Sequence, residues 1–159
     1  MLHTLVNYLS GLTASLHHAP PKSQIVRISS ATHPPGKTPK FDHILLVDDI
    51  ARNTQTALET IRQFYRDCDL TVHITHTFNE ALAAFNVFDI KLIILDLDLD
   101  DHQGDGAILL RKFRDRKPDV IVLANSSEQK YNDILVKGGA NAVLAKDTRK
   151  LRRWLTKNG

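Results

Sequence analysis

The sequence predicts an α/β protein in which a parallel sheet carries helices on both faces. Two observations support this fold class. From residue 41 onward, short apolar runs follow one another along the chain, as expected for strands buried on both sides. Stretches with helical periodicity lie between these runs, and this alternation is typical of a doubly wound parallel sheet. The length of 159 residues suits one domain with an appendage.

The first 40 residues differ in composition from the rest of the chain. Five of the six prolines precede residue 41, among Ser, Thr and Gly, which predicts a linker. Ahead of them, apolar residues share one helical stripe and predict a short amphipathic helix. We therefore expect an N-terminal helix and Pro-rich linker over residues 1–40, and one domain over residues 41–159. The stripe consists of Leu2, Leu5, Val6, Leu9, Leu12 and Leu16.

Within the domain, five strands and five helices are expected to alternate. The apolar runs predict strands at His43–Val47, Leu70–Thr75, Lys91–Leu95, Val120–Ala124 and Ala142–Ala145. The intervening periodicity predicts helices at Arg52–Arg66, Phe78–Phe85, Gly104–Arg116, Glu128–Lys137 and Thr148–Lys157. Because a helix lies between each pair of consecutive strands, every connection can be a right-handed crossover.

The amino-acid composition indicates the cellular environment of the protein and the kind of surface it offers to partners. The single cysteine, Cys68, excludes an internal disulfide and favours a reducing cytosol, so a cytoplasmic protein is expected. No run of about 18 apolar residues is present, so no membrane span is expected. The segment 146–159 is strongly basic, which is typical of the solvated face of a terminal helix or of a partner surface.

Charged residues follow three of the predicted strands. Asp48 and Asp49 come after the first strand, Asp96 after the third, and Lys146 after the fifth. In open parallel sheets, ligands bind outside the carboxyl ends of the strands, at the point where the strand order reverses. If the first and third strands are neighbours, the three carboxylates converge in one pocket and Lys146 reaches the same edge.

Such a cluster needs a compensating charge. Three carboxylates repel one another, and a hard divalent cation removes that penalty. Mg²⁺ favours a few carboxylates completed by waters and phosphate oxygens. A carboxylate beside such a metal can attack a phosphoryl group, while an ammonium group offsets the charge that is transferred.

Three motifs extend this interpretation. The segments "ILLVDDI", "FDIKLIILDLDLDDHQGDG" and "GGANAVLAKD" resemble the receiver domain of bacterial two-component response regulators, including the chemotaxis regulators. They occur in the family's order and at strand ends, and the resemblance covers about Phe41 to Lys157. It implies a flavodoxin-like, doubly wound, five-stranded parallel sheet in the order 2-1-3-4-5, with Mg²⁺ as cofactor.

The resemblance also implies a role for each matching residue. Asp96 matches the aspartate that accepts phosphate from a histidine kinase or phosphotransfer protein. Asp48 and Asp49 match the Mg²⁺-binding acidic pair. Asp98 matches the position whose backbone carbonyl ligates the metal and whose side chain tunes dephosphorylation. Lys146 matches the lysine that pairs with the acceptor carboxylate and then with the phosphoryl group.

Further acids and a glycine follow the acceptor strand. Gly104 matches the turn glycine that opens the third helix of the family. Asp100, Asp101 and Asp105 lie in the loop and early helix, where acids favour the positive helix end. We expect them to cap the helix and to favour solubility.

Two residues depart from the family pattern. Ala124 stands where the fourth strand usually ends in Thr or Ser, and Val143 replaces the usual aromatic residue of the fifth strand. Ser126 or Ser127 could supply the missing hydroxyl, the signal could leave by another face, or the domain could be a static docking module. Asn125 beside the pocket could contact phosphate or restrict access.

The expected function is a signalling switch and not an enzyme. The printed sequence ends after the last helix, so output is expected through protein contacts, with no direct binding of nucleic acid. The face formed by helix four, strand five and helix five is the family's usual partner or dimer face, and a homodimer stays open. A pseudo-receiver that needs no phosphate is the alternative. A phosphatase of the haloacid dehalogenase type is disfavoured, because Asp100 occupies the fourth place after Asp96, where that family has Thr or Val.

Overall fold

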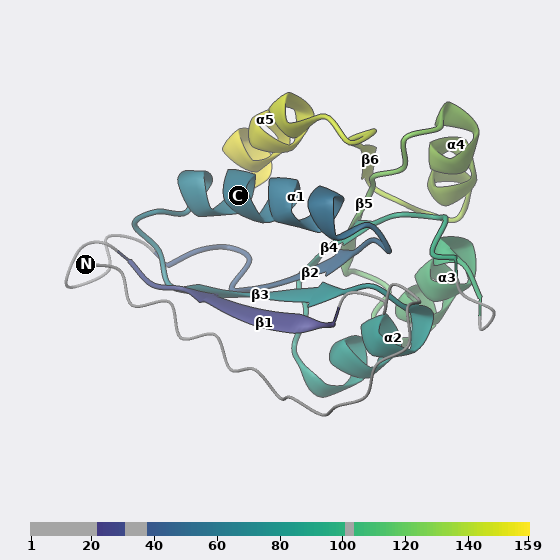
Figure 1. The fold of residues 1–159 in the computed structure, drawn as a ribbon, viewed down its shortest axis with the longest axis horizontal. Helices are drawn as coiled ribbons and strands as arrows, with labels where there is room; N and C mark the ends of the chain where they lie inside the picture. The colour runs from purple at the N-terminus through teal and green to yellow at the C-terminus, as the bar shows by residue number, and fades with distance from the viewer. Residues whose placement is uncertain (1–21, 31–37, 101–103) are drawn as a thin grey trace, which may run out of the picture.

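The structure, a computed structural model, describes residues 22–30, 38–100 and 104–159. Within these ranges the chain forms a six-stranded sheet with helices on both faces (Figure 1). The strand order is β1-β3-β2-β4-β5-β6, with β1 antiparallel to β3 and the other strands parallel. The amphipathic helix expected before residue 17 lies outside the described residues.

The elements alternate along the chain from β2 onward. The strands are β1 Gln24–Ile28, β2 His43–Val47, β3 Leu70–Thr75, β4 Leu92–Leu95, β5 Ile121–Ala124 and β6 Ala142–Val143. The helices are α1 Ala51–Phe64, α2 Phe78–Val87, α3 Gly106–Arg116, α4 Gln129–Lys137 and α5 Thr148–Asn158. No helix in the described ranges is long and apolar enough to cross a membrane.

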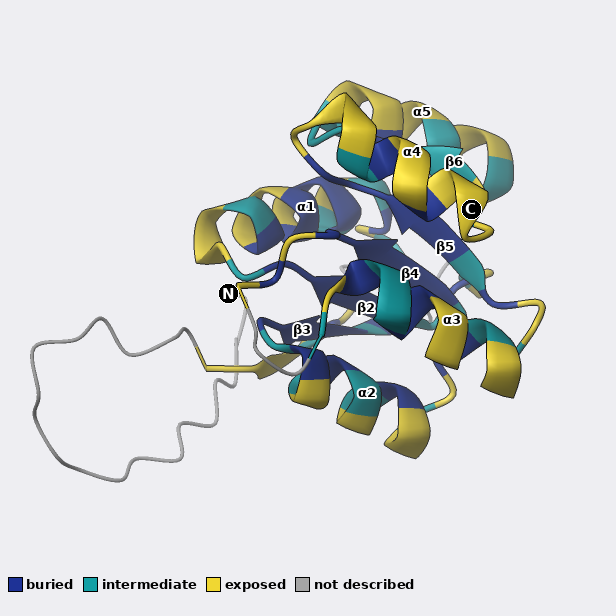
Figure 2. Cartoon of the chain, turned by 90° about the vertical axis from the view of Figure 1, so that its right-hand side faces the viewer, coloured by how far each residue is buried: buried dark blue, intermediate teal, exposed yellow. Residues whose placement is uncertain are grey.

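The central strands are buried on both faces, which explains their unbroken apolar runs. Successive side chains of a strand point to opposite faces. On β2, Ile44 and Leu46 therefore join the core under α1 and α5, while Leu45 and Val47 join the core under α2, α3 and α4. Figure 2 shows this buried sheet between two layers of helices whose outer surfaces are exposed. The sheet thus holds the loops at its carboxyl edge on a rigid base.

Side-chain caps begin three of the helices. Asp105 Oδ1 accepts hydrogen bonds from the backbone N–H groups of Ala107 and Ile108 at the start of α3. Asp147 accepts from Arg149 N at the start of α5, and Thr77 Oγ1 accepts from Glu80 N at the start of α2. These contacts satisfy N–H groups that have no partner within the helix. The expected capping role of Asp105 is confirmed.

The parallel strands β3-β2-β4-β5-β6 have the order 2-1-3-4-5 expected from the resemblance. The expectation of only five strands is wrong, because β1 adds an antiparallel strand at the edge of the sheet. Its residues were expected to form part of the linker. The prolines on both sides dominated that interpretation, whereas Ile28 is buried in the core and Val26 packs against it.

Several element boundaries differ from the expectation by one or two residues, and two of these differences lie at the carboxyl edge of the sheet. Strand β6 ends at Val143 and not at Ala145, because Ala145 and Lys146 adopt positive φ angles of 55° and 58°. This left-handed turn takes the chain out of the sheet at Lys146. Helix α3 begins at Gly106 and not at Gly104, whose φ of 147° is not helical.

Candidate functional site

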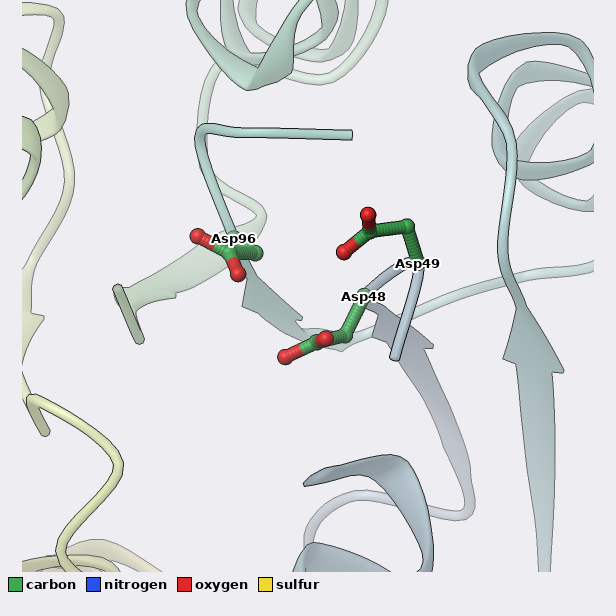
Figure 3. A group of neighbouring side chains, drawn as sticks. All are labelled: Asp48, Asp49 and Asp96. Carbon is green, nitrogen blue, oxygen red and sulfur yellow. The ribbon is translucent and has the colours of Figure 1, made fainter. Parts of the chain in front are cut away.

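The predicted carboxylate cluster forms at the carboxyl edge of the sheet. Strands β2 and β4 are neighbours, with Val47 opposite Leu95, so the residues that follow them lie at the same level. Oxygen atoms of Asp48, Asp49 and Asp96 all lie within 4.8 Å of one another. Figure 3 shows the three side chains converging from the ends of these two strands. The structure therefore brings together the acidic residues that the sequence singled out.

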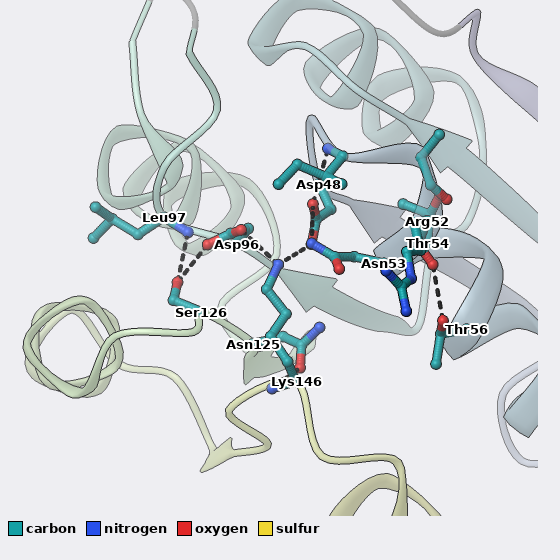
Figure 4. Close-up of polar contacts among 12 residues, drawn as sticks. Asp48, Arg52, Asn53, Thr54, Thr56, Asp96, Leu97, Asn125, Ser126 and Lys146 are labelled. Carbon is teal, nitrogen blue, oxygen red and sulfur yellow. Dashed lines mark hydrogen bonds and ion pairs between the residues drawn. The ribbon is translucent and has the colours of Figure 1, made fainter.

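Lys146 supplies a cation to this cluster. Its Nζ donates to Asp96 Oδ2 at 2.6 Å and also contacts Asp48 Oδ2 (Figure 4). Asn125 holds the lysine loop in place, because its Oδ1 accepts a hydrogen bond from Lys146 N at 2.9 Å. Asn125 thus contacts the backbone of the lysine, a role that the sequence left open.

Asp48 also fixes the start of α1. Its Oδ1 accepts hydrogen bonds from Ile50 N and from Asn53 Nδ2, both at 3.0 Å. Its backbone oxygen lies 2.7 Å from His76 Nδ1. Sequence reasoning missed Asn53 and His76. The position of Asn53 one turn into α1 was the only signal for it, whereas His76 follows its own strand, β3, at the same edge of the sheet.

Burial controls the electrostatics of the acidic pair. It raises the pKa of Asp48 above the usual value, although the hydrogen bond and charge of Lys146 oppose this shift. The pKa of Asp49 is raised by burial and then by the charges of Asp48, Asp96 and Asp98. A carboxylate cluster that is short of positive charge gains from an added cation.

The donor atoms fit the metal implied by the resemblance. Asp48, Asp49 and Asp96 offer only oxygen, which is the ligand that Mg²⁺ prefers, and they converge closely enough to share one ion. Asp49 is half-buried, so solvent reaches the cluster. Asp98 is exposed, and its charge acts on Asp49. The expected ligation by the backbone carbonyl of Asp98 stays a prediction.

The two atypical positions lie side by side in the sheet. Ala124 is fully buried at the end of β5 and is paired in register with Val143 of β6. Neither side chain has a polar atom. The hydroxyl near Asp96 belongs instead to Ser126, whose Oγ donates to Asp96 Oδ1 at 2.5 Å. Ser127 is exposed, so of the two serines considered, Ser126 is the one at the site.

A glycine packs against the loop that begins at Asp96 and was missed by sequence reasoning. A Cβ atom added at Gly106 would lie 2.2 Å from the backbone oxygen of Asp96 and 2.7 Å from the Cα of Leu97. Gly106 N also donates to Leu97 O at 2.8 Å. Only glycine allows this approach, and the second glycine of "QGDG" was the available signal. Gly104, the expected turn glycine, packs against Phe78.

A cavity of about 400 Å³ adjoins the site between α1 and the loop before α5. Asn53 and Thr56 line it from α1, Asn125 and Lys146 line it from the facing loops, and Thr148 lines it from the start of α5. These side chains are mainly hydrogen-bond donors and acceptors. The lysine is therefore reachable from this side as well as from the acidic cluster.

The comparisons with known proteins agree with this geometry. The family model described as the response regulator receiver domain matches residues 44–155. The chain therefore belongs to the response regulator receiver domain family, which serves two-component signalling. A search of curated proteins gave no match.

Solved structures with the same fold include several receivers. The chemotaxis response regulator CheY4 of Vibrio cholerae matches with a TM-score of 0.62 and 19% identity, over 74% of this chain and 98% of that chain. The receiver domain of NtrX from Brucella abortus matches with a TM-score of 0.60 and 19% identity, over 73% and 99% of the two chains. A CheY-like receiver domain protein from Methanospirillum hungatei JF-1 has a TM-score of 0.52 and 20% identity, over 76% and 100%. At these identities the likeness shows the fold alone.

Proposed function

We propose that this chain is a phosphorelay receiver that accepts a phosphoryl group on Asp96 and signals through protein contacts. The observation that carries the proposal is the position of Lys146, which bridges Asp48 and Asp96 inside a cluster of three carboxylates. A lysine with a purely structural role would need only one ion-pair partner. Lys146 instead contacts both the proposed acceptor Asp96 and the proposed metal ligand Asp48. The role is that of a switch, without the steady turnover of an enzyme.

Each residue has a definite task in this proposal. Asp48, Asp49 and Asp96, together with the backbone carbonyl of Asp98, would hold Mg²⁺. The ion, when bound, neutralises charge on the phosphoryl oxygens and aligns the group with the acceptor. Lys146 holds the Asp96 carboxylate in place before transfer and then pairs with the phosphoryl group, since Asn125 fixes its backbone and its Nζ donates to Asp96 Oδ2.

The transfer is a substitution at phosphorus. An oxygen of Asp96 forms a bond to the phosphorus of a phosphohistidine, the phosphorus–nitrogen bond breaks, and the electron pair returns to the imidazole of the donor. The product is an acyl phosphate. Water later attacks the phosphorus, and the acyl phosphate releases inorganic phosphate and the Asp96 carboxylate. The side chain of Asp96 is only 8% exposed, so the approach of water is restricted.

The donor would be a histidine kinase or a phosphotransfer protein, as family membership suggests. Output would pass through the face formed by α4, β6 and α5. The outer side of α5 carries exposed cations, which suits an acidic partner surface or a second copy of the chain. They are Arg149, Lys150, Arg152, Arg153 and Lys157.

A pseudo-receiver that docks partners without phosphate is the second candidate. The polar atoms of the pocket support it, because Asp96 already accepts hydrogen bonds from Ser126 and Lys146. A pocket satisfied in this way is stable without any phosphoryl group. This candidate predicts neither Mg²⁺ binding near Asp96 nor a response to beryllofluoride.

The deciding experiment is intact-mass spectrometry after incubation with acetyl phosphate and Mg²⁺. We expect one phosphoryl adduct per chain in the wild type and none in Asp96→Asn. As a matched control, Asp115→Asn makes the same change at an exposed position of α3 and should leave the adduct intact. An adduct that persists in Asp96→Asn would place the acceptor elsewhere, and a folded wild type without an adduct would favour the docking module.

A further inference from the structure

Ser126 is fully buried between the acceptor and α4, and its polar atoms are engaged on both sides. Its Oγ donates to Asp96 Oδ1 and accepts from Leu97 N at 3.0 Å. The hydroxyl therefore contacts the side chain of the acceptor and the backbone just after it. Water has no access to replace either contact, so a change at Asp96 acts directly on Ser126.

The backbone of Ser126 is fastened to α4 by a single side chain. Ser126 N donates to Asn132 Oδ1 at 2.9 Å, and Asn132 Nδ2 donates to Ser126 O at 2.8 Å. Asn132 lies within α4 and is fully buried. Its Nδ2 also donates to Glu128 O at the beginning of the helix, where Glu128 itself provides no side-chain cap. The two-point contact therefore ties the position of Ser126 to that of α4.

We propose that Ser126 and Asn132 transmit the phosphorylation state of Asp96 to helix α4, replacing the coupling that Ala124 and Val143 cannot provide. The proposal rests on the proposed function, since it requires Asp96 to be phosphorylated. It identifies a route of output, which receiver family membership alone does not give for a chain with this pair of residues.

Phosphoryl transfer changes the Ser126 contact whichever oxygen of Asp96 reacts. If Oδ1 reacts, the hydroxyl faces the new phosphoryl oxygens. If Oδ2 reacts, Oδ1 becomes the neutral carbonyl of an acyl phosphate. In the first case the Ser126 hydroxyl donates to the charged phosphoryl oxygens. In the second case its hydrogen bond to Oδ1 weakens, because a hydrogen bond to a charged acceptor is roughly twice as strong as one between neutral groups. In both cases the loop before α4 has a different preferred position.

The movement would reach the molecular surface through α4. Leu135 anchors the inner side of this helix in the core, whereas Ile134 and Val136 are 44% and 45% exposed. A displacement at Asn132 would therefore alter the presentation of two apolar side chains to a partner. The apolar pair Ala124 and Val143 lies outside this polar route, which explains how a receiver could dispense with the usual hydroxyl and aromatic residue.

The test combines intact mass with hydrogen exchange of α4. Wild type, Ser126→Ala, Asn132→Ala and Ser127→Ala are treated with acetyl phosphate and Mg²⁺, and amide exchange is followed in the peptide that covers residues 128–137. We expect Asn132→Ala and Ser127→Ala to form the adduct as the wild type does and Ser126→Ala, which lacks the hydroxyl beside Asp96, to form it more slowly, so each chain is compared only once its mass shows the adduct. Exchange in α4 should change on phosphorylation in the wild type and in Ser127→Ala, the matched control with an exposed hydroxyl, and the change should be lost in the other two variants.

A fifth variant separates transmission from packing. Ser126→Thr keeps the hydroxyl and should restore the response of α4, whereas a loss caused only by altered packing would not be restored. An unchanged α4 response in Ser126→Ala, with the adduct present, overturns the proposal. Absence of the adduct in the wild type overturns the proposed function and this inference with it, so the two failures are distinguishable.

Discussion

Two clusters of titratable side chains are buried in the same sheet, and they are stabilised in opposite ways. At the carboxyl edge, Asp48 and Asp96 share the cation of Lys146. At the other end of the sheet, His43 Nδ1 lies 3.0 Å from His73 Nε2, while the buried His73 Nδ1 has no hydrogen-bond partner in the described structure. The acidic cluster is paired with a cation, whereas the histidine pair packs among aromatic rings.

Burial shifts the pKa values of acids and bases in opposite directions. Burial raises the pKa of Asp48, so this group holds a proton more readily in the folded chain. Burial, followed by the charge of His43, lowers the pKa of His73 to about 4. The folded chain therefore disfavours the charged form at both places. Only the acidic cluster has a cation nearby and room for another, which makes it the site where chemistry is expected.

The largest expected effect is the pH dependence of stability caused by His73. Its pKa falls from 6.5 when unfolded to about 4 when folded, so the unfolded chain binds more protons between these values. Stability from this group is complete above pH 6.5 and is lost as the pH falls toward 4, by about 3 kcal/mol. Urea unfolding of the wild type and His73→Phe from pH 7 to 4 measures this loss.

The variant serves as the internal control for the other titrating groups. The raised pKa values of Asp48 and Asp49 have the opposite sign, since they stabilise the fold at low pH and this contribution disappears as the pH rises through the folded pKa. The difference between the two chains therefore isolates His73. Equal pH slopes in both chains would show that the histidine is not held neutral by burial.

The second effect is the loss of phosphoryl transfer in Lys146→Ala. The variant removes the cation that faces Asp48 and Asp96, and loss of one such donor typically slows a reaction by about 10²–10³-fold. The initial rate of adduct formation with acetyl phosphate measures it. Lys150→Ala, on the exposed side of α5, should react at the rate of the wild type. An unfolded Lys146→Ala would instead assign the lysine a structural role.

The third effect concerns the contact between Gly106 and the backbone of Asp96. Gly106→Ala would place a Cβ atom 2.2 Å from the Asp96 backbone oxygen, so the loop that carries Asp96 must shift. We expect destabilisation of about 2 kcal/mol, typical of overpacking, together with slower adduct formation. In Gly138→Ala the added atom would meet Leu110 Cδ2 at 3.0 Å, a side-chain end that can move. Equal losses in the two variants would contradict a special role for Gly106.

The sequence predicted the acidic cluster because carboxylates at the ends of neighbouring strands must meet once the strand order is known. Asp48, Asp96 and Lys146 follow buried apolar runs, and the sheet leaves them no other edge. Strand β1 could not be predicted, since it lies among the prolines before residue 41 and pairs antiparallel with the edge of the otherwise parallel sheet. The histidine pair was also missed, because His43 and His73 are diagonal neighbours on β2 and β3, where His43 is paired with Thr71 and His73 with Leu45.

The position of Ser126 illustrates a second limit of sequence reasoning. The loop between β5 and α4 could have brought either Ser126 or Ser127 to the acceptor, and neither spacing nor periodicity distinguishes them. The choice depends on Asn132, a helical residue whose side chain binds the backbone of Ser126 at two points. Loop conformations held by such contacts between a side chain and the backbone become visible only in three dimensions.

The smallest expected effect is stabilisation by Mg²⁺, which the acidic cluster can bind and the histidine pair cannot. At a concentration ten times its dissociation constant, a ligand that binds only the folded chain adds about 1.4 kcal/mol to the free energy of unfolding. Thermal unfolding with Mg²⁺, against NaCl of equal ionic strength, should show this gain in the wild type and in Asp115→Asn. Asp49→Asn should need more Mg²⁺, because it lacks one of the three converging carboxylates. Equal Mg²⁺ dependence in Asp49→Asn and the wild type would place the ion away from this cluster.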